Sequence, residues 1–196
     1  MWRGVRVIQK PTEKPISVAL LKKRLRLDED HEDDLIEGFL DSAIAKIDGP
    51  EGGIGYAMME QTWRKAMDEF PSVILLPGAP IKSVSEIKYI DRSGDEQTMD
   101  AADYRVDLDT EPARVTPAFG KSWPTARDVT SAVMVEYVLG ENDPSAVPSD
   151  LVNAIGLMMA HWFQHREEVV VGTIVAKIPN GAHSTLDEYR RIRVAS

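Results

Sequence analysis

The sequence contains no cysteine among its 196 residues. A disulfide framework, a thiolate metal site and a cysteine nucleophile are therefore excluded. Long apolar runs are missing as well, because the longest lies around Val169–Val175 and a membrane-spanning helix needs about 18 apolar residues. The amino terminus, MWRGVRVIQKPTEKP, lacks the continuous apolar core of a signal peptide. We therefore expect a protein that neither crosses a membrane nor is exported.

Positive charge is also scarce. The chain has 23 Lys and Arg against 32 Asp and Glu, which gives a net charge of -9. Such a protein repels phosphate, so nucleic-acid binding is disfavoured as its main function. The hydrophobic share of 43% and the charged share of 28% are typical of a folded globular protein.

Two segments have strong helical periodicity. In the first, apolar residues recur at three- and four-residue intervals from Leu35 to Ile47, until Gly49 and Pro50 end the helix. The second lies behind Pro148 and carries an apolar stripe over residues 151–163. A shorter helix is predicted after Ser17, a plausible N-cap that follows an extended amino-terminal arm. We expect the two long stripes to share one core made of Leu35, Phe39, Leu40, Ile44, Ile155, Met159 and Trp162.

Between these helices the apolar pattern changes to the alternation that is typical of strands. It predicts an antiparallel β unit of about five or six short strands, chosen from seven candidate segments. The candidate strands lie at residues 63–67, 73–76, 84–90, 97–99, 104–108, 113–116 and 132–138. The predicted fold class is therefore α+β, with a helical bundle formed by the amino- and carboxy-terminal helices and an inserted antiparallel β unit. The expected parts of this one structural domain are an arm and bundle helices (1–58), the β unit (59–147), and a bundle helix with a tail (148–196).

Two histidines are the main candidates for chemistry. His161 and His165 lie four residues apart on the second long helix, so both could face one metal ion. The general-base glutamate of the zinc-protease pattern is absent, because Trp162 follows His161. A small metal-dependent hydrolase that also uses Glu167 or Glu168 is the alternative function. Histidines at the edge of a packed helix are the simpler interpretation, and we expect no metal, no cofactor and no catalytic residue.

A second motif resembles the end of a phosphate-binding loop. Gly120, Lys121 and Ser122 have the right order, but Val115 stands where that loop needs its first glycine. Trp123 and Pro124 also disfavour the helix that should follow. A nucleotide site is therefore not predicted.

The order of several short motifs resembles the small head-tail connector (adaptor) proteins of long-tailed bacteriophages and phage-like gene transfer agents. The resemblance covers roughly residues 15–175, and it depends on the order of all the motifs rather than on any single one. They are PISVALLKKRLRL at 15–27, EDDLIE at 32–37, QTW at 61–63, FP at 70–71, LLPGAPIKSV at 75–84, DYRV at 103–106, GKSWP at 120–124, HW at 161–162 and REEVVVGT at 166–173.

The resemblance implies a structural role without enzymatic activity. Members of this family form a ring of about twelve copies that joins the portal of a DNA-filled head to the next neck (stopper) protein and extends the DNA channel. It thus implies a homo-oligomer, a portal partner, a stopper partner and DNA that passes without sequence-specific binding. The expected location is the neck of a virion or phage-like particle, after synthesis in the bacterial cytoplasm. A monomeric regulatory module remains a weaker alternative.

The carboxy-terminal segment, from about Thr185 to Ser196, is the candidate portal contact. It combines apolar side chains with arginines in an otherwise acidic chain, as expected of a short segment that docks on a partner. The predicted portal-binding residues are Leu186, Tyr189, Arg190, Arg191, Ile192, Arg193 and Val194. The alternative is that this segment packs back on its own bundle.

Overall fold

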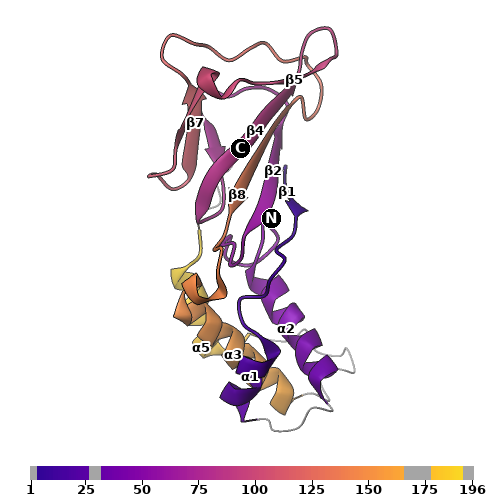
Figure 1. The fold of residues 1–196 in the computed structure, drawn as a ribbon, viewed down its shortest axis with the longest axis vertical. Helices are drawn as coiled ribbons and strands as arrows, with labels where there is room; N and C mark the ends of the chain where they lie inside the picture. The colour runs from indigo at the N-terminus through magenta and orange to yellow at the C-terminus, as the bar shows by residue number, and fades with distance from the viewer. Residues whose placement is uncertain (1–3, 27–31, 166–177, 192–196) are drawn as a thin grey trace. The chain divides into compact units, whose positions relative to one another are not determined.

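The chain divides into two compact units, one built from strands and one from helices (Figure 1). The computed structural model describes residues 4–26, 32–165 and 178–191. Within these residues, no helix combines the length and the apolar character that a membrane span requires. Unit 1 comprises Met1–Thr12, Glu60–Gly140 and Arg191–Ser196, and unit 2 comprises Glu13–Met59 and Glu141–Arg190.

The larger sheet of unit 1 is antiparallel and has five strands in the order β1-β2-β8-β4-β5. Its central strand β8 is paired on both sides, and every second residue of it is buried. That alternation is the period of a strand with one face against a core. The strands are β1 (Val5–Gln9), β2 (Gln61–Met67), β8 (Val133–Leu139), β4 (Ile81–Ile90) and β5 (Glu96–Thr98).

A smaller antiparallel sheet of three strands completes unit 1. Its order is β3-β7-β6, with Val115 in the middle of β7 opposite both Ile74 and Val106. A short 3-10 helix, η1 (Ala101–Asp103), leads into it. The strands are β3 (Ile74–Leu76), β7 (Ala113–Pro117) and β6 (Tyr104–Asp107).

Two large aromatic side chains form the centre of unit 1. Trp63 and Tyr137 are fully buried and meet edge to face, with ring centroids 6.3 Å apart. Both polar groups are satisfied, because Trp63 Nε1 donates to Gln61 Oε1 at 2.7 Å and the Tyr137 hydroxyl donates to the Pro77 carbonyl at 2.9 Å. Each ring therefore contributes its apolar area without an unsatisfied donor.

Unit 2 consists of helices that pack their apolar stripes together. Ser17 caps α1, since its Oγ accepts from the Leu20 amide at 3.2 Å. Phe39 of α2 and Trp162 of α3 meet edge to face at 6.3 Å. The bounds are α1 (Val18–Leu25), α2 (Asp33–Ile47), the 3-10 helix η2 (Pro144–Ala146), α3 (Ser149–Gln164) and α5 (Asn180–Glu188).

The predicted helical core is present in unit 2. Five of its seven members are buried: Phe39, Leu40, Ile155, Met159 and Trp162. The other two, Leu35 and Ile44, are half-buried at the edge of the α2 stripe. Apolar spacing of three and four residues was therefore a sound guide to which faces meet.

The predicted fold class is wrong. The described residues contain four α-helices and eight strands in two antiparallel sheets, with similar numbers of residues in helices and in strands. This is not a helical bundle with an inserted β unit. The amino-terminal arm supplies β1, so the larger sheet draws on chain that precedes the first helix. Val5 and Val7 alternate with Arg6 and pair with β2, a pattern too short to predict a strand by itself.

Candidate functional site

The candidate portal-binding segment is described as far as Arg191. Most of this part is the helix α5, which packs on α3 within unit 2. Ala182 and Leu186 lie four residues apart and are both buried. Ile192, Arg193 and Val194 lie outside the described residues.

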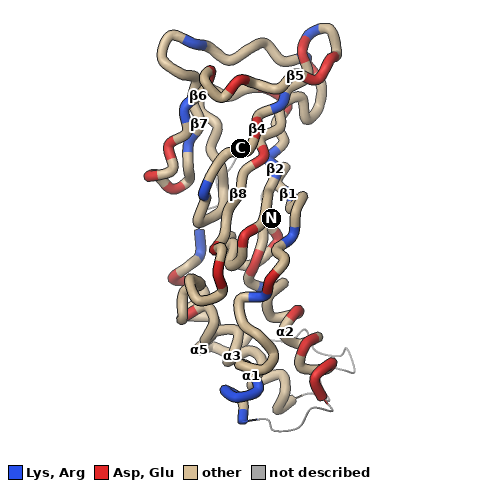
Figure 2. The backbone as a smooth tube through the Cα atoms, in the orientation of Figure 1, with Lys and Arg blue, Asp and Glu red and all other residues tan. Residues whose placement is uncertain are grey.

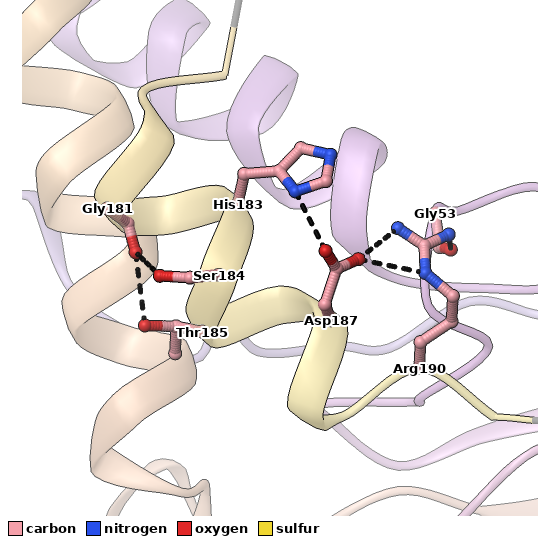
Figure 3. Close-up of polar contacts among 7 residues, drawn as sticks. All are labelled: Gly53, Gly181, His183, Ser184, Thr185, Asp187 and Arg190. Carbon is pink, nitrogen blue, oxygen red and sulfur yellow. Dashed lines mark hydrogen bonds and ion pairs between the residues drawn. The ribbon is translucent and has the colours of Figure 1, made fainter.

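Two hydroxyl groups in α5 bond back to their own helix (Figure 3). Ser184 Oγ and Thr185 Oγ1 both donate to the Gly181 carbonyl, at 3.1 and 3.2 Å. Such bonds give the hydroxyl groups a partner but do not stabilise the helix. The helix has nine residues, which is too few for it to be stable alone in water. It is therefore stabilised by its packing on α3.

A carboxylate with an arginine and a histidine as neighbours holds the end of α5 (Figure 3). Asp187 Oδ1 accepts from Arg190 Nη2 at 2.8 Å and from Arg190 Nε at 3.1 Å. His183 Nδ1 lies 2.9 Å from Asp187 Oδ2. The hydrogen bond from Arg190 is the main reason that the pKa of Asp187 is lowered from its ordinary value, and the charge of His183 acts in the same direction. We call His183, Asp187 and Arg190, with the Gly53 carbonyl described next, the clasp.

Arg190 also reaches a loop that is distant in sequence. Its Nη1 donates to the Gly53 carbonyl at 2.6 Å. The loop after α2 has a tight backbone, because a Cβ on Gly52 would collide with the carbonyl oxygens of Ile47 and Asp48. The Gly53 amide donates to the Lys46 carbonyl at 2.8 Å, which holds in place the residue whose carbonyl receives the arginine. The glycine-rich loop at 51–55 is thus a docking point for α5.

An aromatic pair lies beside the clasp. Tyr189 meets Tyr56 edge to face, with ring centroids 5.9 Å apart and planes at 86°. Asp48 Oδ1 accepts from the Gly49 and Met58 amides at 2.9 and 3.0 Å and so braces the loop that carries Tyr56. The end of α5 is therefore attached to the rest of unit 2 by both polar and apolar contacts.

The predicted portal-binding residues thus divide into groups. Leu186, Tyr189 and Arg190 all contact unit 2 of their own chain. Arg191 Nε lies 3.1 Å from Glu111 Oε1 in unit 1. Whether these residues contact a portal stays a prediction.

Sequence reasoning missed the clasp, although its spacing was visible. His183 and Asp187 are four residues apart and Asp187 and Arg190 are three apart, the separations at which helical side chains meet. Only the link to Gly53, which is 137 positions from Arg190 along the chain, had no local signal.

The two candidate metal-binding histidines do lie together. The rings of His161 and His165 have centroids 4.6 Å apart, and His165 Nδ1 lies 2.9 Å from the His161 carbonyl. Among the described residues, no group of three or more His, Asp or Glu is placed to hold a metal ion. Glu167 and Glu168, the acids of the alternative function, lie outside them.

The motif that resembles a phosphate-binding loop is a turn. Gly120 has a φ of 75° and the Lys121 amide donates to the Ala118 carbonyl at 2.9 Å. Lys121 Nζ lies 2.9 Å from Asp103 Oδ1. No helix follows Ser122, so this stretch lacks the helix amino terminus on which a phosphate would rest.

Comparison with solved structures gives matches over almost the whole chain. A chain from "Neck of empty GTA particle computed with C6 symmetry" matches with a TM-score of 0.75 and 25% identity, and 97% of each chain is covered. One from "Neck of native GTA particle computed with C12 symmetry" matches with a TM-score of 0.67 and 26% identity over 96% of this chain and 97% of that one. The resemblance to head-tail connectors of phage-like particles is confirmed. A chain from "Virion of native gene transfer agent (GTA) particle" shares the fold, with a TM-score of 0.74, 24% identity and 97% of each chain covered. No family model and no curated protein sequence matches the chain.

Proposed function

We propose that this chain is a structural subunit of the neck of a phage-like particle and acts as a head-tail connector. The observation that carries the proposal is the structural match to gene transfer agent neck components, which extends over 97% of both chains at 25% identity. A match of that extent involves both units rather than one shared motif. The role is mechanical, and the proposal assigns no enzymatic reaction to the chain.

The proposed assembly is a ring of twelve copies. Its support is that the similar neck structures were computed with sixfold and twelvefold symmetry. A ring needs a head-to-tail contact, in which two different surfaces of the same chain meet. Twelve copies with a net charge of -9 each repel phosphate, which suits a channel through which DNA passes without sequence-specific binding.

The proposed partners at the two ends of the ring are the portal and the next neck (stopper) protein. We assign the portal contact to the carboxy-terminal segment from Leu186 to Val194. Within it, Leu186, Tyr189 and Arg190 attach the segment to unit 2, and the residues from Arg191 onward supply the contact with the portal. Arginines in this part can pair with carboxylates on the partner.

The proposal is tested by locating the chain in particles. The full chain is produced with an affinity tag in cells that make the particles, and intact particles are purified by density. Electron microscopy with a gold label on the tag should place the label at the neck. Particles without the chain, or a label along the head or tail, would contradict the proposed function.

A further inference from the structure

A fully exposed aromatic side chain stands on the loop between β7 and β8. Phe119 has a relative exposure of 106%, far above any other large apolar residue among those described. It lies in the turn from Ala118 to Lys121, next to Gly120 with its positive φ. Around Gly120, no other atom lies within 4 Å of the place where a Cβ would be. A phenylalanine in such a position contributes nothing to the core of its own chain.

The loop that presents Phe119 is fixed at several points. It connects β7 with β8 across one end of unit 1 (Figure 1). Trp123 stacks on Phe70, with centroids 5.0 Å apart and planes at 14°. Four further contacts lie along it: Ala118 amide to Asp103 carbonyl (2.9 Å), Lys121 to Asp103 (2.9 Å), Arg127 amide to Ile90 carbonyl (2.9 Å) and Ser131 amide to Asp68 Oδ1 (2.8 Å). Because the turn is already ordered, little conformational entropy remains to be lost on binding.

Unit 2 carries a groove that is lined by apolar and charged residues. Its volume is about 800 Å³, within the range of cavities that hold a ligand or a short peptide segment. Its apolar lining includes Ile16, Val147 and Val152, which are 2%, 5% and 7% exposed, and Leu20, which is 46% exposed. Five charged residues also line it: Glu13, Lys14, Arg24, Glu37 and Asp143. We call this the α1 groove.

We propose that the Phe119 turn of one copy docks in the α1 groove of a neighbouring copy. This inference rests on the proposed function, because it requires copies of this chain to be neighbours in the neck. The aromatic ring fills the apolar part of the groove, beside Leu20. The contact joins two different surfaces of the same kind of chain, one from each copy, as a head-to-tail ring contact requires.

Charge is compatible with a second copy as the occupant. In the loop from 117 to 131, Lys121 is paired with Asp103, and Arg127 and Asp128 offset each other, so the loop carries no excess negative charge in a chain that is acidic overall. In the α1 groove, Lys14 is paired with Glu37, which leaves Glu13 and Asp143 against Arg24. The loop can therefore approach this acidic groove without the repulsion that acts between most surfaces of copies with a net charge of -9.

The absence of cysteine allows a direct test. Ser122→Cys and Ser149→Cys are introduced together into the full chain, and particles are assembled with it. Ser122 lies beside the turn and Ser149 lines the α1 groove, and both are exposed. A short bis-maleimide reagent should link neighbouring copies into a ladder of oligomers. The matched control pairs Ser149→Cys with Ser93→Cys, an exposed serine in the turn between β4 and β5, and should give no ladder.

Phe119→Ser then tests the anchor itself. Added to the cysteine pair, it should reduce the cross-linked fraction at least about tenfold, since exposed aromatic anchors dominate such contacts. The thermal midpoint of the monomer should not change, because Phe119 is outside the core. If labelled particles contain the chain at the neck but no 122–149 link forms, or position 122 links to a different protein, this inference is wrong and the proposed function stands. If the chain is absent from the neck, the proposed function fails and this inference fails with it.

Discussion

At the scale of single residues, Gly78 shows how closely the core of unit 1 is packed. It has a φ of 97°, and a Cβ there would lie 2.6 Å from Trp63 Cζ3 and 2.8 Å from Leu139 Cδ1. Gly78→Ala should therefore destabilise the protein by about 2 to 5 kcal/mol, through backbone strain and overpacking together. Urea denaturation followed by tryptophan fluorescence measures the loss.

A matched glycine separates the two causes. Gly120 also has a positive φ, of 75°, but no atom lies within 4 Å of the position that a Cβ would take there. Gly120→Ala should cost only the backbone term, about 1 to 2 kcal/mol. Equal losses in the two variants would show that the contact with Trp63 is unimportant.

Lys65 is a residue whose burial makes stability depend on pH. Its Nζ donates to the Leu75 carbonyl at 2.7 Å, and burial lowers its pKa from the ordinary value of 10.5. Between the lowered pKa and 10.5 the unfolded chain binds more protons than the folded one, so this residue's contribution to stability rises with pH across that window. Below the window both states are protonated and the cost of burying the charge is fully present.

Lys65→Met tests this dependence, because it keeps the length of the side chain and removes the charge. The difference in free energy of unfolding, wild type minus variant, should increase as pH approaches 10.5 from below. Denaturation of both proteins at a series of pH values measures that difference and cancels groups they share. A difference that is constant with pH would contradict the assignment.

At the scale of elements, the clasp decides how firmly α5 is attached. Its members Asp187 and Arg190 are about half exposed, so Arg190→Ala should change the free energy of unfolding by no more than about 1 kcal/mol. Local opening of α5 is more sensitive, and we expect amide exchange over residues 182–188 to become roughly fivefold faster. Hydrogen-exchange mass spectrometry measures this, with Glu188→Gln as the control in the same helix.

The clasp also has a pH dependence with a defined sign. The pKa of Asp187 is lowered in the folded chain from 3.8. Its stabilising effect is therefore present above pH 3.8 and is lost as pH falls through the lowered value. At such a pH the exchange rates of α5 in wild type and Arg190→Ala should converge, and a persistent difference would mean that Arg190 acts mainly through Gly53.

The elements differ in how well the sequence predicts them. Residues 35–47 and 151–163 repeat their apolar spacing over three turns or more, and α2 and α3 lie there. The seven predicted strand segments all coincide with observed strands. By contrast, β1 has five residues and α5 buries only Ala182 and Leu186, so neither has enough repeats to reveal its period. The predicted fold class gave the helices too large a share of the structure. The reason is that each short strand is a weak signal by itself, and only the pairing of the strands shows that they form two sheets.

The site was less predictable than the elements. The concentration of arginines near the end of the chain was visible in the sequence, whereas the Gly53 carbonyl that receives Arg190 and the α1 groove were not. Both depend on contacts between segments far apart in the chain. The exposure of Phe119 had no signal either, because an aromatic residue near a predicted strand is more often buried.

At the scale of the whole molecule, charge is unevenly distributed within an acidic chain. Within unit 2, Figure 2 shows cations gathered on α1 and carboxylates at the start of α2. One cation of α1 is paired with a carboxylate of α2, since Lys22 Nζ lies 2.7 Å from Asp33 Oδ1. A charge that is already paired inside the chain, as these two are, contributes less to the selection of a partner.

Removing the last six residues tests the proposed portal contact. The chain should end after Arg190, because Leu186 is buried and an earlier stop would expose the core of unit 2. Loss of the ion pair between Arg191 and Glu111, which is half exposed, should cost no more than about 1 kcal/mol, so the thermal midpoint should barely move. Capture of filled heads by the tagged, shortened chain should be lost, because the residues assigned to the portal are gone.

A variant of full length guards against an effect of shortening alone. Arg191→Gln together with Arg193→Gln keeps every apolar residue and removes two charges. If arginines pair with carboxylates on the portal, capture of filled heads should fall at least about tenfold and depend less on salt concentration. As a control, a chain that lacks only Ser196 should capture heads as the wild type does. Full capture by the chain that ends after Arg190 would show that the portal binds elsewhere, and the clasp would then serve only to hold α5 on its own unit.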